Sequence, residues 1–380
     1  MQEDIDHLTQ WINEIQVIIN DLNSKKRSSD ILVFMIGSTS QDNGDGRPYL
    51  TPIRKISNGF VFGSIVYSQT QAILLSSKID GHVDFIFVDA EKKLPINNNP
   101  DHSPFDYFGI TDSNLNKNRM VEYGNISSVC SNIIQSSHMF AYKGNDMTVD
   151  TTWLFLIEKF RELSGMKILI YGAGNIGNKL ALKLVECGCD VIFVTRDLLK
   201  TESIIDSLNR IKSPSVLSSI TASMEPEISS KDVDAIIGCT NAEPVITETM
   251  IENMNHNGVV IDIGKGTIFQ NAIDVCNTKG IETWRLDITA IINSLISSST
   301  SMQSLLRSSF GRREIIDNIF IVSGGFIGSK YDIIVDSYIQ PKTIVGVCEG
   351  SGKIFFDLDE AAQKNLKLVE SFIKASNQES

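Results

Sequence analysis

Several features that would place this chain in a specialised class of protein are missing from its sequence. No stretch reaches the ~18 consecutive apolar residues of a membrane-spanning helix. Met1 begins an acidic amphipathic segment without the pattern of a signal peptide. A net charge of −12 provides little basic surface for a nucleic acid backbone. We therefore expect a soluble, cytoplasmic protein whose partners include neither nucleic acid nor a membrane.

Paired cysteines are missing as well. The six cysteines are scattered and contain no CxxC spacing of the kind that binds zinc or forms a redox disulfide, so we expect no metal site. The remaining composition, 42% hydrophobic and 21% charged, is that of an ordinary globular protein with a full core. At 380 residues the chain is long for one domain, and its length favours two.

The most informative pattern that is present spans residues 166–196. An apolar strand, Ile168 to Tyr171, runs directly into three glycines spaced GxGxxG, and a helix and a second strand follow. In a dinucleotide-binding βαβ unit the first glycine allows the sharp turn, the second lets the backbone approach a diphosphate, and the third lets the helix pack on the strand. The predicted cofactor-binding residues of this segment are Gly172, Gly174, Asn175, Ile176 and Gly177.

The end of the second strand distinguishes the two nicotinamide dinucleotides. An acidic residue about 20 positions after the glycines would bind the 2′-hydroxyl of NAD, but this chain has Thr195 and Arg196 there. A hydroxyl followed by a guanidinium suits a 2′-phosphate, because arginine forms charge-assisted, forked hydrogen bonds. We therefore predict NADP as the cofactor, with NAD less favoured. In the alternative interpretation, Asp197 holds a ribose hydroxyl and Arg196 is only solvated.

Further short apolar strands are predicted at 215–220, 233–239, 258–263 and 282–286, separated by helix-length segments, as in a doubly wound parallel Rossmann sheet. Two loops leave the carboxyl ends of these strands, where open α/β sheets bind ligands. From them we predict Cys239, Thr240, Asn241 and Gly264 as cofactor-binding residues, the alternative being tight turns alone. No histidine lies near Cys239 in sequence to activate it as a nucleophile.

The predicted organisation has three parts. Residues 1–150 are predicted to form a smaller α/β substrate domain, because strand and helix patterns alternate along them. The expected elements are a helix over 5–22, strands at 31–36, 60–67 and 83–88, and a helix at 69–77. A helix over 151–163, with Asp150 as a candidate N-cap, leads into the NAD(P)-binding domain at 151–310. Residues 311–380 form a strand-rich appendage that ends in a helix around 359–373, and the serine-rich run at 294–309 is a helix or hinge.

This arrangement resembles the amino-acid-dehydrogenase-like superfamily, which includes shikimate dehydrogenase and methylenetetrahydrofolate dehydrogenase. Val194-Thr195-Arg196 is similar to the Asn-Arg-Thr element of shikimate dehydrogenases, and the segment Gly258 to Gly264 is similar to a strand of the folate enzymes. The resemblance in the second half covers about 130 residues. It implies a two-domain NADP-dependent enzyme with its substrate in the cleft.

The resemblance also implies a lysine and an aspartate that face the nicotinamide. Shikimate dehydrogenases carry Thr-x-Pro-x-Lys and Gly-x-Asn-Thr-Asp; this chain has a similar run at 51–55, with the proline one place early, and another at 144–150, with extra residues. These departures put shikimate itself in doubt as substrate. The implied catalytic residues are Lys55 with Asp150 or Asp146, and Lys78 is the alternative lysine.

Together these patterns predict an NADP-dependent oxidoreductase that transfers a hydride to or from a carbonyl or imine of a small polar metabolite, in a homodimer. In such a reaction a positioned lysine can act as acid or base while a carboxylate orients it. Two alternatives stay open: a methylenetetrahydrofolate-type dehydrogenase or cyclodeaminase on the same scaffold, and a non-catalytic NADP(H)-sensing regulatory protein.

Overall fold

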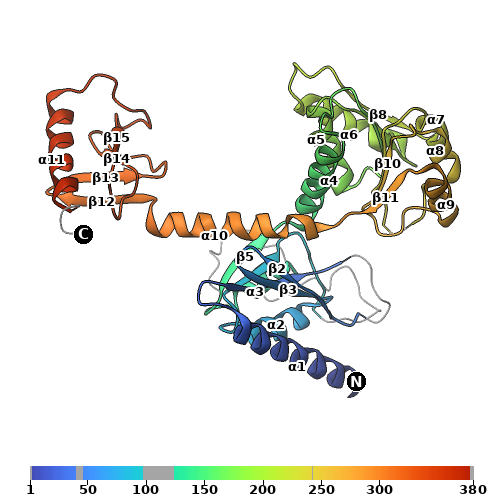
Figure 1. Cartoon of the computed structure of the whole chain (residues 1–380), viewed down its shortest axis with the longest axis horizontal. Helices are drawn as coiled ribbons and strands as arrows, with labels where there is room; N and C mark the ends of the chain where they lie inside the picture. The colour runs from blue at the N-terminus through green and yellow to red at the C-terminus, as the bar shows by residue number, and fades with distance from the viewer. Residues whose placement is uncertain (1, 40–45, 97–123, 242, 377–380) are drawn as a thin grey trace. The chain divides into compact units, whose positions relative to one another are not determined.

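The computed structural model describes residues 2–39, 46–96, 124–241 and 243–376 (Figure 1). The chain divides into two compact units, Met1–Ile292 and Asn293–Ser380. The first unit contains two sheets and the second unit contains one. No helix in the described part of the chain is long and apolar enough to cross a membrane.

The first sheet has five strands in the order β2-β3-β1-β4-β5. Strands β1 (Ile31–Gly37), β3 (Gly59–Ile65), β4 (Phe85–Asp89) and β5 (His138–Tyr142) are parallel, whereas β2 (Tyr49–Ile56) is an antiparallel edge. Because the parallel strands share one direction, their carboxyl ends lie at one edge of the sheet. The sequence patterns predicted β1, β3 and β4 but missed β2 and β5.

Helices α1 (Gln2–Lys25), α2 (Gln69–Ile79) and α3 (Ile126–Ser131) cover one face of this sheet (Figure 1). The helix expected over 5–22 is present as part of α1, and its side chains Trp11, Ile15 and Ile19 are buried, since helical spacing places them on one face. These side chains pack into a core that contains the edge-to-face pair Phe34 and Phe62, whose ring centroids lie 4.8 Å apart.

The second sheet is fully parallel, in the order β11-β10-β9-β6-β7-β8. Its strands are β6 (Lys167–Tyr171), β7 (Asp190–Val194), β8 (Ile220–Ser223), β9 (Ala235–Gly238), β10 (Val259–Asp262) and β11 (Glu282–Arg285). From β8 to β11 this is the 3-2-1-4-5-6 order of the dinucleotide-binding fold, in which the strand order reverses between β6 and β9. The predicted doubly wound Rossmann sheet is therefore confirmed, although β8 begins five residues later than expected.

Helices lie on both faces of the second sheet. Helices α4 (Gly144–Phe160), α5 (Asn175–Glu186) and α6 (Leu198–Ile211) share one core with it, while α8 (Glu248–Asn253) and α9 (Gln270–Lys279) share the core on the other face. The short α7 (Pro226–Ser229) and a 3₁₀ helix, η2 (Ile288–Ile291), complete this part of the chain. Central strands such as β9 are buried along their whole length because helices cover both faces.

Helix α4 joins the two sheets and differs from the helix expected at 151–163. It begins at Gly144, directly after β5, so residue 150 lies inside the helix and not at its start. The candidate N-cap role of Asp150 is therefore wrong; that side chain forms an ion pair with Lys183 of α5 instead. The predicted division at 150/151 falls within this continuous helix.

The second unit contains most of α10 (Ile292–Ser308), the strands β12 (Gly311–Ile316), β13 (Ile319–Ser323), β14 (Ile333–Val335) and β15 (Ile344–Val347), and α11 (Glu360–Ser376). The four strands form one sheet, and α11 packs its apolar stripe, including Val369 and Ile373, against it. The predicted appendage thus has its own core. Its boundary lies at 292/293 and not at 310/311, because the serine-rich helix belongs to this unit.

Candidate functional site

The three glycines of the GxGxxG segment have the separate roles that their spacing predicts. Gly172 follows β6 with a φ of 109°, a left-handed conformation that glycine adopts without steric cost. A Cβ on Gly177 would lie 2.2 Å from the carbonyl oxygen of Gly172, so only glycine allows this turn of α5 to pack so closely. A Cβ on Gly174 would have no atom within 4 Å, which leaves open space over the turn.

That open space lies at the amino terminus of α5. Gly174 is the N-cap residue, and no side chain caps the helix, so the first amides of the helix, from Asn175 on, are available to a ligand. Asn178, which sequence reasoning missed, donates a hydrogen bond of 3.1 Å from its side-chain amide to the carbonyl oxygen of Ala173 and closes the turn. Bare amides and a helix dipole form an anion site, and this cradle fits the diphosphate of a dinucleotide.

The end of β7 contains the residues on which the predicted choice between NADP and NAD depends. The Arg196 side chain is 81% exposed, and its guanidinium forms a long ion pair of 3.4 Å with Glu243. The Asp197 carboxylate, by contrast, is the N-cap of α6 and accepts a hydrogen bond of 3.1 Å from the amide of Lys200. The aspartate of the alternative interpretation is thus occupied by a structural role, whereas the guanidinium of Arg196 is exposed to solvent.

The two loops after β9 and β10 are packed against each other beside the glycine turn. The Gly264 amide donates a hydrogen bond of 3.0 Å to the carbonyl oxygen of Gly238. A Cβ on Gly172 would lie 3.2 Å from the backbone of Cys239, so the β9 loop borders the predicted diphosphate turn. Burial, followed by the nearby Asp262 carboxylate, raises the pKa of the Cys239 thiol to about 12, which keeps it protonated and unreactive.

A cavity of about 350 Å³ lies within the first unit, where residues from both of its sheets meet. One side of the cavity is formed by the edge strand β2, the start of α4 and the ends of β1, β4 and β5. The loops after β9, β10 and β11 contribute the other. Four predicted cofactor-binding residues line it: Cys239, Thr240, Asn241 and Gly264.

The predicted catalytic lysines are not among the residues that line this cavity. Lys55 is exposed on β2, and Lys78 is exposed in the last turn of α2. The neighbour of Lys55, Arg54, does line the cavity and donates a hydrogen bond of 3.1 Å to the Thr289 hydroxyl. A register shift between Thr51 and Arg54 explains the difference, because a bulge exchanges the faces to which the following side chains point.

The predicted carboxylates take part in ion pairs between helices. The Asp146 carboxylate contacts the ammonium groups of Lys179 on α5 and, at 2.5 Å, Lys143. Asp150 pairs with Lys183 one turn further along the same two helices. The structure therefore does not bring Lys55 or Lys78 together with either aspartate, and these carboxylates join α4 to α5.

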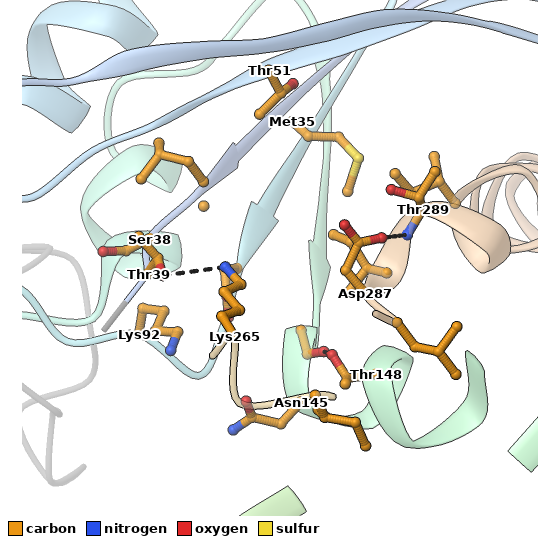
Figure 2. Close-up of a pocket in the computed structure, with 18 of the residues that line it drawn as sticks. Met35, Ser38, Thr39, Thr51, Lys92, Asn145, Thr148, Lys265, Asp287 and Thr289 are labelled. Carbon is orange, nitrogen blue, oxygen red and sulfur yellow. Dashed lines mark hydrogen bonds between the residues drawn. The ribbon is translucent and has the colours of Figure 1, made fainter. Parts of the chain in front are cut away.

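Other charged groups line the cavity that sequence reasoning did not select. Lys92 follows β4, Lys265 follows β10, and Asp287 caps η2. Figure 2 shows the Lys265 side chain extended toward Thr39 on the same side of the pocket as Lys92, with Asp287 and Thr289 on the other side. The signal available in the sequence was a lysine between two glycines at a strand's carboxyl end.

Two buried acids lie at the carboxyl ends of β4 and β5. Asp89 is 3% exposed, and burial raises the pKa of its carboxyl although the amide of Glu91 donates a hydrogen bond of 2.8 Å to it. Burial, followed by repulsion from Asp89, also raises the pKa of the Tyr142 phenol. Both groups therefore hold their protons more tightly than they would in water.

Comparison with known proteins supports the assignment of the second sheet. Residues 156–275 match the family described as Shikimate / quinate 5-dehydrogenase, which confirms the predicted resemblance over that segment and agrees with the predicted enzyme class of dehydrogenases and reductases. The matched segment covers less than half of the chain.

Two glutamyl-tRNA reductases are also similar to part of this chain. The protein from a Sulfurovum species is 33% identical over 92 residues, 24% of this chain and 20% of that protein. The protein from a Nitratiruptor species is 30% identical over 107 residues, 28% and 23% of the two chains. The chain thus spans about a fifth of the length of these relatives.

Among solved structures, a shikimate dehydrogenase in complex with NADP+ has 13% identity and a TM-score of 0.35, covering 68% of this chain and 85% of the other.

Proposed function

We propose that this chain is an NADP-dependent oxidoreductase that transfers a hydride to or from a carbonyl or imine of a small polar metabolite in the cavity of the first unit. One observation carries the proposal: the loop after β9 borders the diphosphate turn, the loop after β10 packs against that loop, and both line a cavity completed by the first sheet. A dinucleotide with its diphosphate on α5 could extend its nicotinamide along these loops.

The cofactor, when bound, supplies the hydride, so the chain's own residues need to bind, orient and move a proton. The amides at the start of α5 would hold the diphosphate, and Arg196 would contact the 2′-phosphate. Hydroxyl and amide groups of Ser38, Asn145 and Thr148 line the cavity and would orient a polar substrate. The cytoplasmic location and the homodimer remain part of this proposal.

A single substitution tests the cofactor site without disturbing the fold. In Gly174→Asp the new side chain enters open space at an N-cap position, where aspartate stabilises a helix. The same carboxylate would repel a diphosphate. We expect unfolding at or above the wild-type temperature, together with at least ~100-fold weaker NADPH binding by calorimetry, because like charges in close contact are unfavourable by several kcal/mol.

Turnover is measured with the wild-type protein, NADPH and a panel of keto acids and imines by following the absorbance of the reduced nicotinamide. Oxidation of NADPH that depends on one of these compounds would support an enzyme. Tight binding of NADPH without turnover, coupled to a change in oligomeric state, would favour the sensing function. Absence of heat with both reduced and oxidised nucleotides would contradict the proposal itself.

A further inference from the structure

We propose that Lys265 is the residue that transfers the proton during the hydride transfer. This inference rests on the proposed function, and it assigns the acid–base role to a residue of the β10 loop in the nucleotide-binding sheet.

The backbone of Lys265 has a conformation that lysine seldom adopts. Its φ is 65°, in the left-handed region, between Gly264 and Gly266. Non-glycine residues held in this region cost of order 1–3 kcal/mol and cluster at functional sites. The buried carboxylate of Asp262 holds the turn, because it accepts hydrogen bonds of 2.7 Å from the Gly266 amide and 2.8 Å from the Thr267 hydroxyl.

This conformation directs the side chain into the cavity. Lys265 is half-buried and lines the cavity, and its ammonium lies 3.5 Å from the Thr39 hydroxyl at the end of β1, on the other sheet (Figure 2). The adjacent residue, Gly264, is part of the loop that borders the expected nicotinamide position. Lys265 therefore reaches the substrate space from the cofactor side, within the region where hydride transfer would occur.

The surroundings of Lys265 favour loss of its proton. Burial lowers the pKa of its ammonium first, and the positive charges of Arg285 on β11 and Lys92 after β4 lower it further, while Asp287 opposes them. Beyond these groups, Asp89 lies near Lys92, and Arg54 lines the cavity from β2. An acid or base is most effective when its pKa lies near the working pH, so this downward shift suits proton transfer.

The chemistry balances with a reduced nicotinamide nucleotide as the hydride donor. The hydride brings two electrons to the carbonyl carbon, the C=O π bond breaks, and its electron pair moves to oxygen. The Lys265 ammonium donates one proton to that oxygen and becomes a neutral amine, and the products are an alcohol and the oxidised nucleotide. Water returns the proton to the amine, and the opposite direction uses the amine as the base.

The first test measures the titration of Lys265 without cofactor or substrate. Amines are labelled with acetic anhydride at a series of values from about pH 6 to 11, and mass spectrometry follows the Lys265 peptide beside the same peptide free in solution. We expect half-labelling in the folded protein at a lower pH than in the free peptide. The pH of half-labelling should rise in Lys92→Met, because a repelling charge is removed. It should fall further in Asp287→Asn, because an attracting charge is removed while a good N-cap residue is kept.

Labelling of Lys265 at the pH of the free peptide, or shifts in Lys92→Met and Asp287→Asn that do not have opposite signs, would contradict the inference. This readout requires neither turnover nor a known substrate. It therefore tests the inference even if the panel of carbonyl compounds yields no activity.

The second test uses any substrate that the panel reveals. Lys265→Met should lower kcat by at least ~100-fold, the usual contribution of general acid–base catalysis, while NADPH binding measured by calorimetry stays within about threefold. Lys231→Met, an exposed lysine just before β9, is the matched control and should retain full turnover. Undiminished turnover in Lys265→Met would overturn this inference alone, whereas a wild type that binds no nicotinamide nucleotide would count against the proposed function.

Discussion

The carbonyl oxygen of Gly172 lies 2.2 Å from the point where a Cβ on Gly177 would be placed. The glycine turn after β6 and the helix α5 that follows it are therefore in direct backbone contact. This closeness predicts that one added methyl group has different consequences at Gly174 and Gly177, which are three residues apart.

Gly177→Ala should destabilise the first unit, because the new methyl group meets a backbone carbonyl that cannot rotate away. The expected loss of unfolding free energy is ~1–3 kcal/mol, as for overpacked cores. Gly174→Ala is the matched control: its methyl group enters open space, and the expected change is within about 1 kcal/mol. Urea denaturation of both variants compares them, and equal losses would contradict the distinct roles of the two glycines.

Arg196→Ala should weaken NADPH binding far more than NADH binding. A charge-assisted hydrogen bond to the 2′-phosphate is worth ~1.5–3 kcal/mol, so the affinity for NADPH should fall about tenfold or more. Calorimetric titration with both nucleotides measures this difference. Glu243→Gln removes only the partner at 3.4 Å and should leave NADPH binding unchanged or stronger. Equal loss of affinity for both nucleotides in Arg196→Ala would show that the guanidinium does not contact the phosphate.

The sequence sufficed for those parts of the fold whose signals are local. A buried strand, three spaced glycines, an amphipathic helix and a second strand occur within 31 residues. The structure contains them as β6, the turn that follows it, α5 and β7. The edge strand β2 was missed because it contains Pro52 and is exposed at several positions, so it lacks the alternation of a half-buried strand. Its bulge places Arg54, and not the expected Lys55, in the lining of the cavity.

The cavity could not be predicted because its residues come from segments that are far apart in the chain. Lys265 and Thr39 are 226 residues apart, and no local pattern joins them. The loop containing Gly264 was correctly placed at the carboxyl end of a strand, but the adjacent lysine was overlooked. Its left-handed φ is a consequence of how Asp262 holds the turn, which only the folded chain reveals.

Asp150→Asn should have only a small effect, in contrast to the loss expected of a catalytic carboxylate. The side chains of Asp150 and Lys183 are 41% and 31% exposed, and ion pairs of this kind contribute ~0–1 kcal/mol to stability. We expect a decrease of less than about 1 kcal/mol by urea denaturation, with turnover retained. A large loss of kcat with unchanged stability would instead return Asp150 to a catalytic role.

Asp89→Asn should remove a pH dependence that burial imposes on the first unit. Burial raises the pKa of the Asp89 carboxyl in the folded state, so the folded protein binds this proton more tightly than the unfolded chain does. The free energy of unfolding therefore falls as the pH rises from the ordinary pKa of 3.8 through the raised pKa. The amide oxygen of asparagine can still accept the hydrogen bond from Glu91. The variant should thus be more stable than the wild type at neutral pH, and the difference should vanish near pH 4 in urea denaturation.

Asp80→Asn provides the control of opposite sign. Burial raises the pKa of Asp80, but hydrogen bonds from the amides of Ser137, Gln135 and Ser136 outweigh it and lower the pKa overall. This carboxylate contributes stability above pH 3.8 that is lost as pH falls through its lowered pKa. Asp80→Asn should therefore be less stable than the wild type at neutral pH, with the difference shrinking in acid. If both variants shifted stability in the same direction at neutral pH, burial would not be the cause of the Asp89 effect.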